Sequence, residues 1–309
     1  MIEIRRILCP IDFSDYSRHA LDHAVAIARC YGSTIALLNV YATAPVPVHA
    51  AGSLMHRAAA VLTPGDRGAL LTAMKGFAEQ EVGSGIPIDF DLSEGPVAAE
   101  ILDRAKTMPA DLLVMGTHGR SGFERLMLGS IAEKVLRKAA CPVLTVPPRA
   151  ADVVPVPPVL FKHIVCATDF SDCATHALDY AMSLAQEADA RLTVLHVLEV
   201  PEDLTPDLYE TAHDGEPTLA SYVKAANRDR RERLQAAVPE TVRTYCTVES
   251  VMATGKPYRE ILRVAGEQPT DLIVMGIRGR RAPDLLFVGS TTHHVVREAR
   301  CPVLTLRWG

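Results

Sequence analysis

Short apolar runs alternate with helical patterns along the whole chain. The apolar runs are rich in β-branched and other aliphatic residues, as strands are, and the segments between them carry small and aliphatic residues at helical spacing. This alternation predicts βαβ units and a mainly parallel sheet covered by helices. The predicted strands lie near residues 5–11, 33–40, 86–92, 111–115 and 142–146, and near 162–168, 190–197, 243–251, 271–275 and 302–306.

The first helix is expected at about residues 15–31. It opens at Ser14 and Asp15, which are typical of a helix start. Its buried face is predicted from the apolar residues at helical spacing, which are Ala20, Leu21, Ala24, Ile27 and Ala28.

The second half of the sequence repeats the first. Segment 164–172 aligns with segment 7–15 at an offset of 157 residues (164 − 7), and Gly276 aligns with Gly116 at an offset of 160 (276 − 116). The second half therefore carries three extra residues (160 − 157) near its middle. A chain of 309 residues is also about right for two domains of roughly 150 residues each.

Prolines mark the boundary between the halves. Pro147 and Pro148 and the proline-rich run 153–158 predict a stiff, extended connector, because proline fixes φ and favours polyproline II. We expect a first domain at 1–148, a linker at 149–160 and a second domain at 161–309. Two long segments, about 42–66 and 199–217, follow the second strand of each domain, and loops of that length are often functional.

Composition narrows the class of protein. The chain is 48% hydrophobic and 22% charged with a formal net charge of -5, which gives no support to nucleic-acid binding. The charged run 228–233 alternates basic and acidic residues and is interpreted as a solvated helix face. No stretch approaches the ~20 apolar residues of a membrane span, and the amino terminus lacks the form of a signal peptide. We expect a cytoplasmic protein without a membrane partner.

The seven cysteines include no C-x-x-C pair, so neither a disulfide framework nor a zinc site is predicted. Cys9 repeats as Cys166, and Cys141 repeats as Cys301. All four stand in apolar strand surroundings, which favours small buried thiols.

The chemistry-bearing feature is a glycine pattern that occurs twice. Its members are Gly116, Gly119, Gly129 and Ser130 in the first half, and Gly276, Gly279, Gly289 and Ser290 in the second. In each half an apolar strand enters the first glycine and a helix follows the serine. Parallel sheets bind ligands beyond the carboxyl ends of their strands, where the direction of winding reverses.

Asp12 and Asp169 close the first strand of each half, so they would share that crevice with the glycines. A phosphate needs backbone N–H groups within reach, and glycine removes the side chain that would obstruct it. The helix start after the last glycine adds unpaired N–H groups and a favourable dipole. The pattern therefore predicts a nucleotide site in each half.

A purely structural interpretation stays open. The glycines could shape a turn, with Ser130 as an N-cap and Glu133 completing a capping box. The second copy has no such box, because Thr291, Thr292 and His293 follow Ser290. Asp12 and Asp169 could likewise be turn or capping residues, and that role does not exclude ligand binding.

These motifs, together with Cys-Pro-Val-Leu-Thr at 141–145 and 301–305, resemble the universal stress protein family in its tandem two-domain form. The resemblance implies an α/β fold of two Rossmann-like (adenine nucleotide alpha hydrolase-like) domains, each a five-stranded parallel sheet of order 3-2-1-4-5. It also implies ATP lying across strands one and four. The residues that the resemblance places against ATP are Asp12, Val40, Gly116, Gly119, Gly129, Ser130, Ile131, Asp169, Val197, Gly276, Gly279, Gly289, Ser290 and Thr291.

The second half departs from the pattern between its glycines. Segment 280–284 replaces segment 120–124, Pro283 removes an N–H donor, and Glu199, Glu202 and Asp203 are expected to overhang the phosphates. Occupancy of the second site is therefore less firmly predicted than that of the first.

No catalytic residue is predicted. The chain lacks a P-loop lysine, and Arg278 stands where His118 would be repeated. His19 and His23 could form a metal pair on the first helix, but the repeat has His176 and Tyr180 there, which favours a pair without metal. No protein metal site is predicted, and Mg²⁺ is expected only through bound phosphates.

The leading hypothesis is an ATP-binding stress-response sensor or regulator that acts on an unidentified protein partner. The alternatives are a slow ATPase or phosphotransferase, and a tandem scaffold that has lost nucleotide binding. The two domains are expected to pair as an intramolecular pseudo-dimer through their fifth strands, and whole chains could pair further.

Overall fold

The computed structural model describes residues 2–41, 62–82, 85–119, 128–148, 161–199, 219–279 and 288–307. The chain divides into two compact units, one of Glu3–Pro158 and one of Val159–Gly309 with Met1–Ile2. The elements of the first unit are β1 (Arg6–Ile11), α1 (Asp15–Tyr31), β2 (Thr34–Tyr41), α2 (Pro64–Val82), β3 (Ile88–Glu94), α3 (Val97–Thr107), β4 (Leu112–Gly116), α4 (Ser130–Lys138) and β5 (Val143–Val146).

The second unit repeats this succession and adds one short helix. Its elements are β6 (His163–Ala167), α5 (Asp172–Ala188), β7 (Arg191–Leu198), α6 (Leu219–Ala236), α7 (Glu240–Tyr245), β8 (Val248–Thr254), α8 (Pro257–Glu267), β9 (Leu272–Gly276), α9 (Ser290–Glu298) and β10 (Val303–Leu306).

Each unit has the predicted strand order. In the first unit the order is β3-β2-β1-β4-β5, and in the second it is β8-β7-β6-β9-β10, which is 3-2-1-4-5 when the strands of each unit are counted separately. The neighbouring strands within each unit pair in parallel. The predicted α/β fold with two tandem Rossmann-like units is confirmed.

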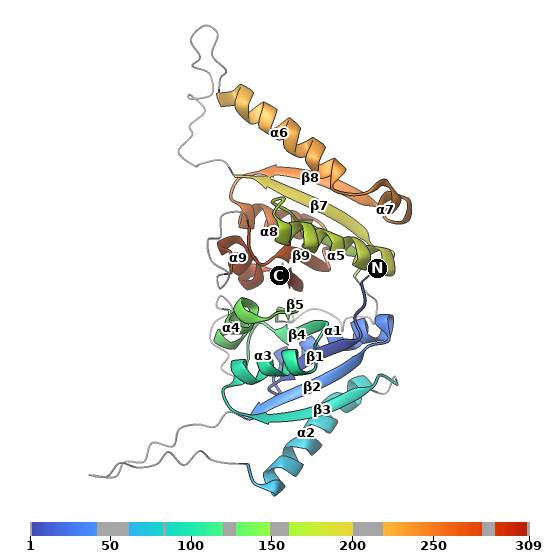
Figure 1. Cartoon of the computed structure of the whole chain (residues 1–309), viewed down its shortest axis with the longest axis vertical. Coiled ribbons are helices and arrows are strands. Elements are labelled where there is room, and N and C mark those ends of the chain that lie inside the picture. The colour runs from blue at the N-terminus through green and yellow to red at the C-terminus, as the bar shows by residue number, and fades with distance from the viewer. Residues whose placement is uncertain are drawn as a thin grey trace, which may run out of the picture. The chain divides into compact units, whose positions relative to one another are not determined.

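The direction of winding decides which face each helix covers. In the first unit α1 packs against α2, and α3 packs against α4, so the two pairs cover opposite faces of the sheet (Figure 1). Right-handed crossovers produce this arrangement, because strands added on opposite sides of the first strand need helices on opposite faces. The reversal lies between β1 and β4, and in the second unit between β6 and β9, as a ligand site of this fold class requires.

Helix α1 shows how the sequence fixes its own bounds. The side chain of Ser14 accepts a hydrogen bond from the Ser17 amide at the start, and Gly32 ends the helix with a left-handed φ of 64°. All five of the predicted apolar residues are less than 5% exposed. A capping serine of this kind contributes about 1 kcal/mol to helix stability.

Strand β8 is where the expected bounds were wrong. The β-branched run from 243 predicted a strand, but residues 240–245 form α7, and β8 begins at Val248. Pro239 is the N-cap of α7, a position near a helix start that proline tolerates. The three extra residues of the second half lie between β7 and β8, because the offset of 157 holds at the start of β7 (191 − 34) and that of 160 at the start of β8 (248 − 88).

Two histidines of the second unit, His163 and His196, are buried. Burial is the main cause that lowers the pKa of both His163 and His196. Nε2 of His163 lies 2.9 Å from Oγ1 of Thr193. The positions aligned with them in the first unit are Arg6 and Asn39, so the first unit has no histidine at either place.

We predict that mild acid destabilises the second unit more than the first. A histidine whose folded pKa is depressed stabilises the fold fully above its unfolded pKa of about 6.5, and that contribution is lost as pH falls through the folded pKa. Hydrogen exchange at pH 7.5 and 5.5, corrected for intrinsic rates, should show lower opening free energies in β6 and β7 but not in β1 and β2. His163→Gln should reduce the effect, and equal losses in both units would contradict this account.

Candidate functional site

The aspartate after the first strand forms a turn in both units. Oδ1 of Asp12 accepts hydrogen bonds from the amide and the hydroxyl of Ser14 at 3.1 and 2.5 Å. Oδ1 of Asp169 accepts the same pair from Ser171 at 3.0 and 2.6 Å. The turn interpretation of both aspartates is therefore correct, and it fixes each carboxylate at the carboxyl edge of the sheet.

The residue after each aspartate has a left-handed backbone, which the sequence analysis missed. Phe13 and Phe170 have φ values of 63° and 62°. A bulky residue in this region costs about 1 kcal/mol or more and concentrates at functional sites. The same cost at the same position in both repeats indicates that the turn is held by its surroundings.

The second glycine of each motif lies against the aspartate. A Cβ built on Gly119 would lie 2.8 Å from Oδ2 of Asp12, and one on Gly279 would lie 2.5 Å from Oδ2 of Asp169. The missing side chain therefore makes room for the carboxylate, and strand one and the glycine loop share one site.

The first glycine of each motif accommodates a helix. A Cβ on Gly116 would lie 3.1 Å from both Cβ and the carbonyl oxygen of Tyr16, and one on Gly276 would lie 2.9 Å from the carbonyl carbon and Cβ of Cys173. Tyr16 and Cys173 stand in the first turns of α1 and α5. These two glycines therefore let the helix pack close to the strand end, and the atoms nearest to the absent side chain belong to the protein.

The sequence analysis expected the third glycine of each motif to help bind phosphate, and the structure corrects this for its amide. The amide of Gly129 donates to the carbonyl of Thr117 at 2.8 Å, and that of Gly289 donates to the carbonyl of Ile277 at 2.9 Å. Neither amide is available to a ligand. These bonds instead tie the start of α4 and α9 to the residue that follows β4 and β9.

The backbone N–H groups that can bind a ligand lie at the starts of α4 and α9. Gly129 and Gly289 are the N-caps of α4 and α9, and neither helix has a capping bond from a side chain. The capping-box interpretation, with Ser130 as the N-cap, is therefore wrong. The amides after each N-cap have no partner within their helix, and in the described part of the chain no other partner is found for Ser130, Ile131, Ser290 and Thr291.

A pocket of ≈ 800 Å³ opens at this edge of the second unit. Four separate stretches of the chain contribute the predicted residues, and every predicted site residue of the second half lines it. They are Asp169, Val197, Gly276, Gly279, Gly289, Ser290 and Thr291. In the first unit the matching residues Asp12, Gly119, Gly129, Ser130 and Ile131 stand at the corresponding strand and helix ends, with Val40 near the end of β2. We call these two sets the second pocket and the first site.

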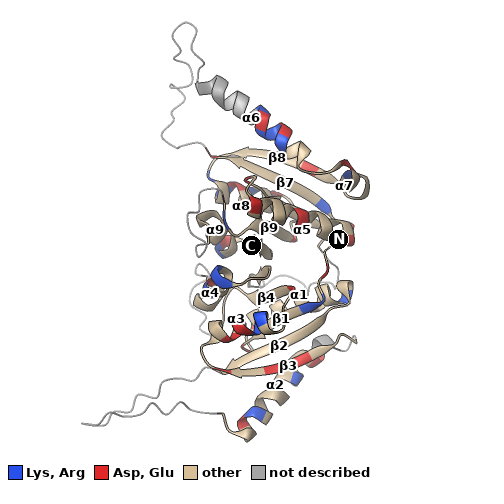
Figure 2. Ribbon diagram, viewed as in Figure 1, with Lys and Arg blue, Asp and Glu red and all other residues tan. Residues whose placement is uncertain are grey.

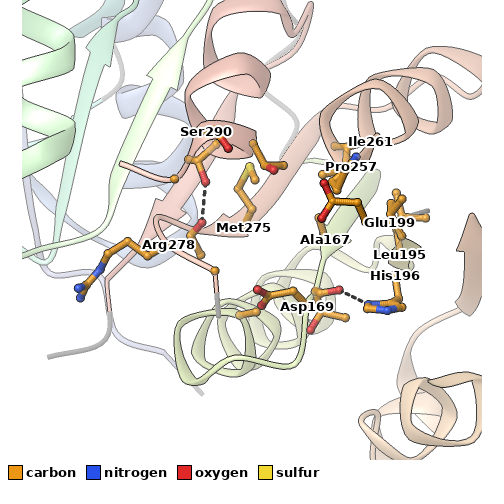
Figure 3. Close-up of a pocket in the computed structure, with 18 of the residues that line it drawn as sticks. Ala167, Asp169, Leu195, His196, Glu199, Pro257, Ile261, Met275, Arg278 and Ser290 are labelled. Carbon is orange, nitrogen blue, oxygen red and sulfur yellow. Dashed lines mark hydrogen bonds between the residues drawn. The ribbon is translucent and has the colours of Figure 1, made fainter. Parts of the chain in front are cut away.

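The second pocket has two chemically different ends. Ser290 and Arg278 lie on one side of it, and Pro257 and Ile261 lie on the other (Figure 3). The first side offers the open amides of α9. The second is mainly apolar, since Ala167 and Leu195 extend the surface of Pro257 and Ile261, and it also carries Glu199 (Figure 3). Such an outline suits a molecule with an anionic end and a flat, weakly polar end.

In each unit a side chain of the second strand donates a hydrogen bond to the backbone carbonyl just before the aspartate. The sequence analysis also missed this contact. Nδ2 of Asn39 donates to the carbonyl of Ile11 at 2.9 Å. Nδ1 of His196 donates to the carbonyl of Thr168 at 2.7 Å, because a carbonyl oxygen can only accept. Asn39 and His196 are aligned, so the two units satisfy the same carbonyl with different side chains.

One arginine of the charged run 228–233 does not belong to the solvated face that was predicted. Arg230 is half-buried and lines the second pocket. The other charges of the run, Arg228, Asp229, Arg231, Glu232 and Arg233, are exposed as predicted, and both signs mix along this end of α6 (Figure 2). The exposed guanidinium of Arg233 lies 4.5 Å from the ring centroid of Phe170. In the first unit Phe77 of α2 packs on Phe13, with ring centroids 5.7 Å apart.

Comparison with known proteins agrees with this geometry. The sequence model of the universal stress protein family matches residues 3–147 and again residues 160–307. The chain belongs to the universal stress protein family.

Two relatives of this universal stress protein each match about one half of it. A universal stress protein of Methanocaldococcus jannaschii is 37% identical over 143 residues, which is 46% of this chain and 81% of the relative. One of Thermus aquaticus is 37% identical over 150 residues, which is 48% of this chain and 100% of the relative. The crystal structure of a universal stress protein from Archaeoglobus fulgidus has the same tandem fold, with a TM-score of 0.67 and 22% identity over 99% of this chain and 97% of that chain.

Burial makes several cysteines of this universal stress protein poor nucleophiles. All seven are free. Burial raises the pKa of Cys9 to about 12, that of Cys141 to about 11 and that of Cys301 to about 12. The thiolate, which is the nucleophile, is therefore scarce at neutral pH. Cys9 and Cys166 are buried as predicted, whereas Cys141 and Cys301 are half-buried.

In the described ranges no group of three or more His, Cys, Asp or Glu side chains is placed to hold a metal ion. The rings of His19 and His23 lie 4.9 Å apart, and Nδ1 of His19 bonds the carbonyl of Pro147 at 3.0 Å. Within the same ranges no helix combines the length and the apolar character needed to cross a bilayer.

Only one of the three acidic residues predicted to overhang the phosphates lies in the described part of the chain. Glu199 lines the second pocket but stands beside Pro257 and Ile261 rather than beside Ser290 (Figure 3). Glu202, Asp203 and Pro283 lie outside the described residues.

Proposed function

We propose that this universal stress protein binds ATP in each of its two domains, 1–148 and 161–309, and acts as a stress-response sensor or regulator. The observation that carries the proposal is the convergence of all seven predicted residues of the second half on one pocket. In the first domain the residues proposed to line the ATP site are Asp12, Val40, Gly116, Gly119, Gly129, Ser130 and Ile131, of which Ser130 and Ile131 offer their amides to the phosphates.

The two ends of the pocket suit the two ends of a nucleotide. Phosphate oxygens accept hydrogen bonds from the amides of Ser290 and Thr291, and the α9 dipole favours their charge. The purine lies against Val197, Pro257 and Ile261, whose apolar surface excludes water from the ring. Asp169 stands between these regions and accepts hydrogen bonds from ribose hydroxyls. Mg²⁺ is held through the phosphates, in keeping with its preference for phosphate oxygen and water.

The end of β7 connects the pocket to the part of the chain where a signal could arise. Leu198 and Glu199 both line the pocket, and they are the last described residues before segment 200–218. In this proposal a bound nucleotide touches Leu198 and Glu199 and so changes the surface that a partner meets.

Analysis of the nucleotide released on denaturing freshly purified protein tests the proposal. We expect ATP or its hydrolysis product in the released fraction, and heat on titration of ATP into the nucleotide-free chain. A chain that carries no nucleotide and gives no heat with ATP would reject the proposal.

The enzymatic alternative, a slow ATPase or phosphotransferase, needs a proton-transfer group at the phosphates. We expect at most weak phosphate release. Steady release that disappears on Gly129→Val, in a preparation free of contaminating ATPase, would favour the alternative. The scaffold alternative predicts no nucleotide binding by either domain.

A further inference from the structure

The residue after the site aspartate keeps a costly backbone conformation in both units. Phe13 and Phe170 have left-handed φ values of 63° and 62°. Glycine adopts this conformation freely, whereas a residue with a side chain is disfavoured there. Both halves nevertheless carry phenylalanine at this place. We therefore expect the ring to make a contact that glycine could not make.

That contact comes from the helix between the second and third strands of each unit. In the first unit Phe77 of α2 meets Phe13 edge to face, at an interplanar angle of 88°. The guanidinium of Arg18 lies 4.0 Å from the centroid of the Phe77 ring. In the second unit Arg233 of α6 lies over the ring of Phe170. The two helices thus reach the equivalent ring with different side chains.

The backbone of Phe13 sets the direction of the Asp12 carboxylate. Oδ1 of Asp12 accepts hydrogen bonds from the amide and the hydroxyl of Ser14, on the far side of Phe13. Both bonds therefore depend on the left-handed residue between the two partners. Oδ2 faces the place where Gly119 has no side chain, within the proposed ATP site. A change of φ at Phe13 would turn this carboxylate away from the ligand.

Helix α2 is weakly fixed to its unit, so single contacts matter to its docking. Among its described side chains only Met74 and Ala78 are buried. Gly68 and Gly76 stand inside the helix, and a Cβ on either would meet nothing within 4 Å. No close packing requires these glycines, and glycine weakens a helix interior. Elements of low local stability are the ones that move in regulation.

We infer that α2 regulates ATP binding at the first site through Phe77 and Phe13. With α2 docked, Phe77 holds Phe13 in its left-handed conformation, and Asp12 faces the nucleotide. Bound ATP in turn holds α2 on the sheet, because a coupling between two events acts equally in both directions. Phe13 is a positioning residue in this scheme. The inference rests on the proposed ATP site and names the helix that reports its occupancy.

Two substitutions of Phe13 separate this coupling from simple packing. Ser290→Asp puts a negative charge at the phosphate end of the second pocket, so calorimetric titration of ATP into that chain reports the first site. In this background Phe13→Ala loses the ring and keeps the cost of the left-handed backbone, and we expect ATP affinity to fall about fivefold. Phe13→Gly loses the same ring without that cost. We expect glycine to restore the affinity to within about twofold.

Phe77→Ala tests the contribution of the helix. We expect ATP affinity to fall about fivefold when Phe13 is present, as loss of an aromatic pair allows, and not to fall further when it is combined with Phe13→Gly. Hydrogen exchange measures the reverse effect: ATP should slow exchange of the α2 amides about fivefold in the Ser290→Asp chain, but not after Phe13→Gly. Lys75→Ala, at an exposed position of α2, is the control and should change neither readout.

Each outcome decides the inference. Equal ATP affinities of the Phe13→Ala and Phe13→Gly chains, or a loss on Phe77→Ala that persists with Phe13→Gly, would overturn it and leave the proposed function standing. If the Ser290→Asp chain with Phe13 and Phe77 intact binds no ATP, the proposed function of the first site fails and the inference fails with it.

Discussion

Ser130→Asp is expected to weaken ATP binding at the first site at least about 100-fold. The new carboxylate would stand at the first residue of α4, within about 4 Å of a bound phosphate. Two unit charges at that distance repel by roughly 4 kcal/mol at an effective dielectric constant of 20, and about 2.7 kcal/mol already corresponds to a hundredfold loss. Calorimetric titration in the Ser290→Asp background, where the first site alone is intact, measures the change.

Ser130→Asn is the matched control, because asparagine has nearly the shape of aspartate without its charge. We expect it to lower affinity less than about tenfold. The aspartate itself should leave the fold intact, since a negative charge at the start of a helix is favourable and Ser130 is exposed. Equal affinities of the Asp and Asn variants would show that phosphate does not bind at α4.

Gly276→Val is expected to destabilise the second unit by about 3 kcal/mol or more. Its Cβ alone would lie 2.9 Å from two atoms of Cys173 and 3.1 Å from the amide of Ala174. Two of these three atoms belong to the backbone of α5, so they cannot yield by a rotamer change, and overpacking of this kind typically costs 1–3 kcal/mol. Chemical denaturation monitored by hydrogen exchange in β6 and β9 gives the loss.

Gly266→Ala provides the comparison in the same unit. A Cβ there meets nothing within 4 Å, and the position lies inside α8, so alanine should stabilise the unit by about 0.5–1 kcal/mol. Similar destabilisation by both variants would mean that the close approach of α5 to β9 does not constrain Gly276. Valine at the first glycine is therefore a poor probe of ligand binding, because it destabilises the fold whether or not a ligand binds.

The sequence predicted the fold well because two independent signals agreed. Apolar periodicity located nearly all strands to within about two residues, and the internal repeat checked each half against the other. The error at β8 has a local cause. Residues 243–247 have strand-like composition, but Pro239 starts a helix just before them, and tertiary context decided the outcome.

The positions of the site residues were predictable, but several of their roles were not. The spacing of the motifs correctly placed the glycines and aspartates at the carboxyl edge of the sheet, where strands one and four end. It could not show that the amides of Gly129 and Gly289 bond within the protein, nor that Gly116 and Gly276 accommodate α1 and α5. Such roles depend on distances between segments that are remote in sequence.

The left-handed residues and the pocket arginine had only weak signals in the sequence. Phe13 and Phe170 occupy equivalent positions in the repeat, but nothing in the propensity of phenylalanine predicts a left-handed backbone. Arg230 was hidden in a run whose alternating charges are typical of a solvent-facing helix. Only the packing of α6 over β7 and β8 brings this arginine to the pocket.

A crystal structure of the chain with a non-hydrolysable ATP analogue tests the central claim most directly. We predict phosphate oxygens about 3 Å from the amides of Ser130 and Ile131, with the purine near Val40. Phosphates bound elsewhere, or those amides bonded to protein atoms while the analogue is present, would contradict the account.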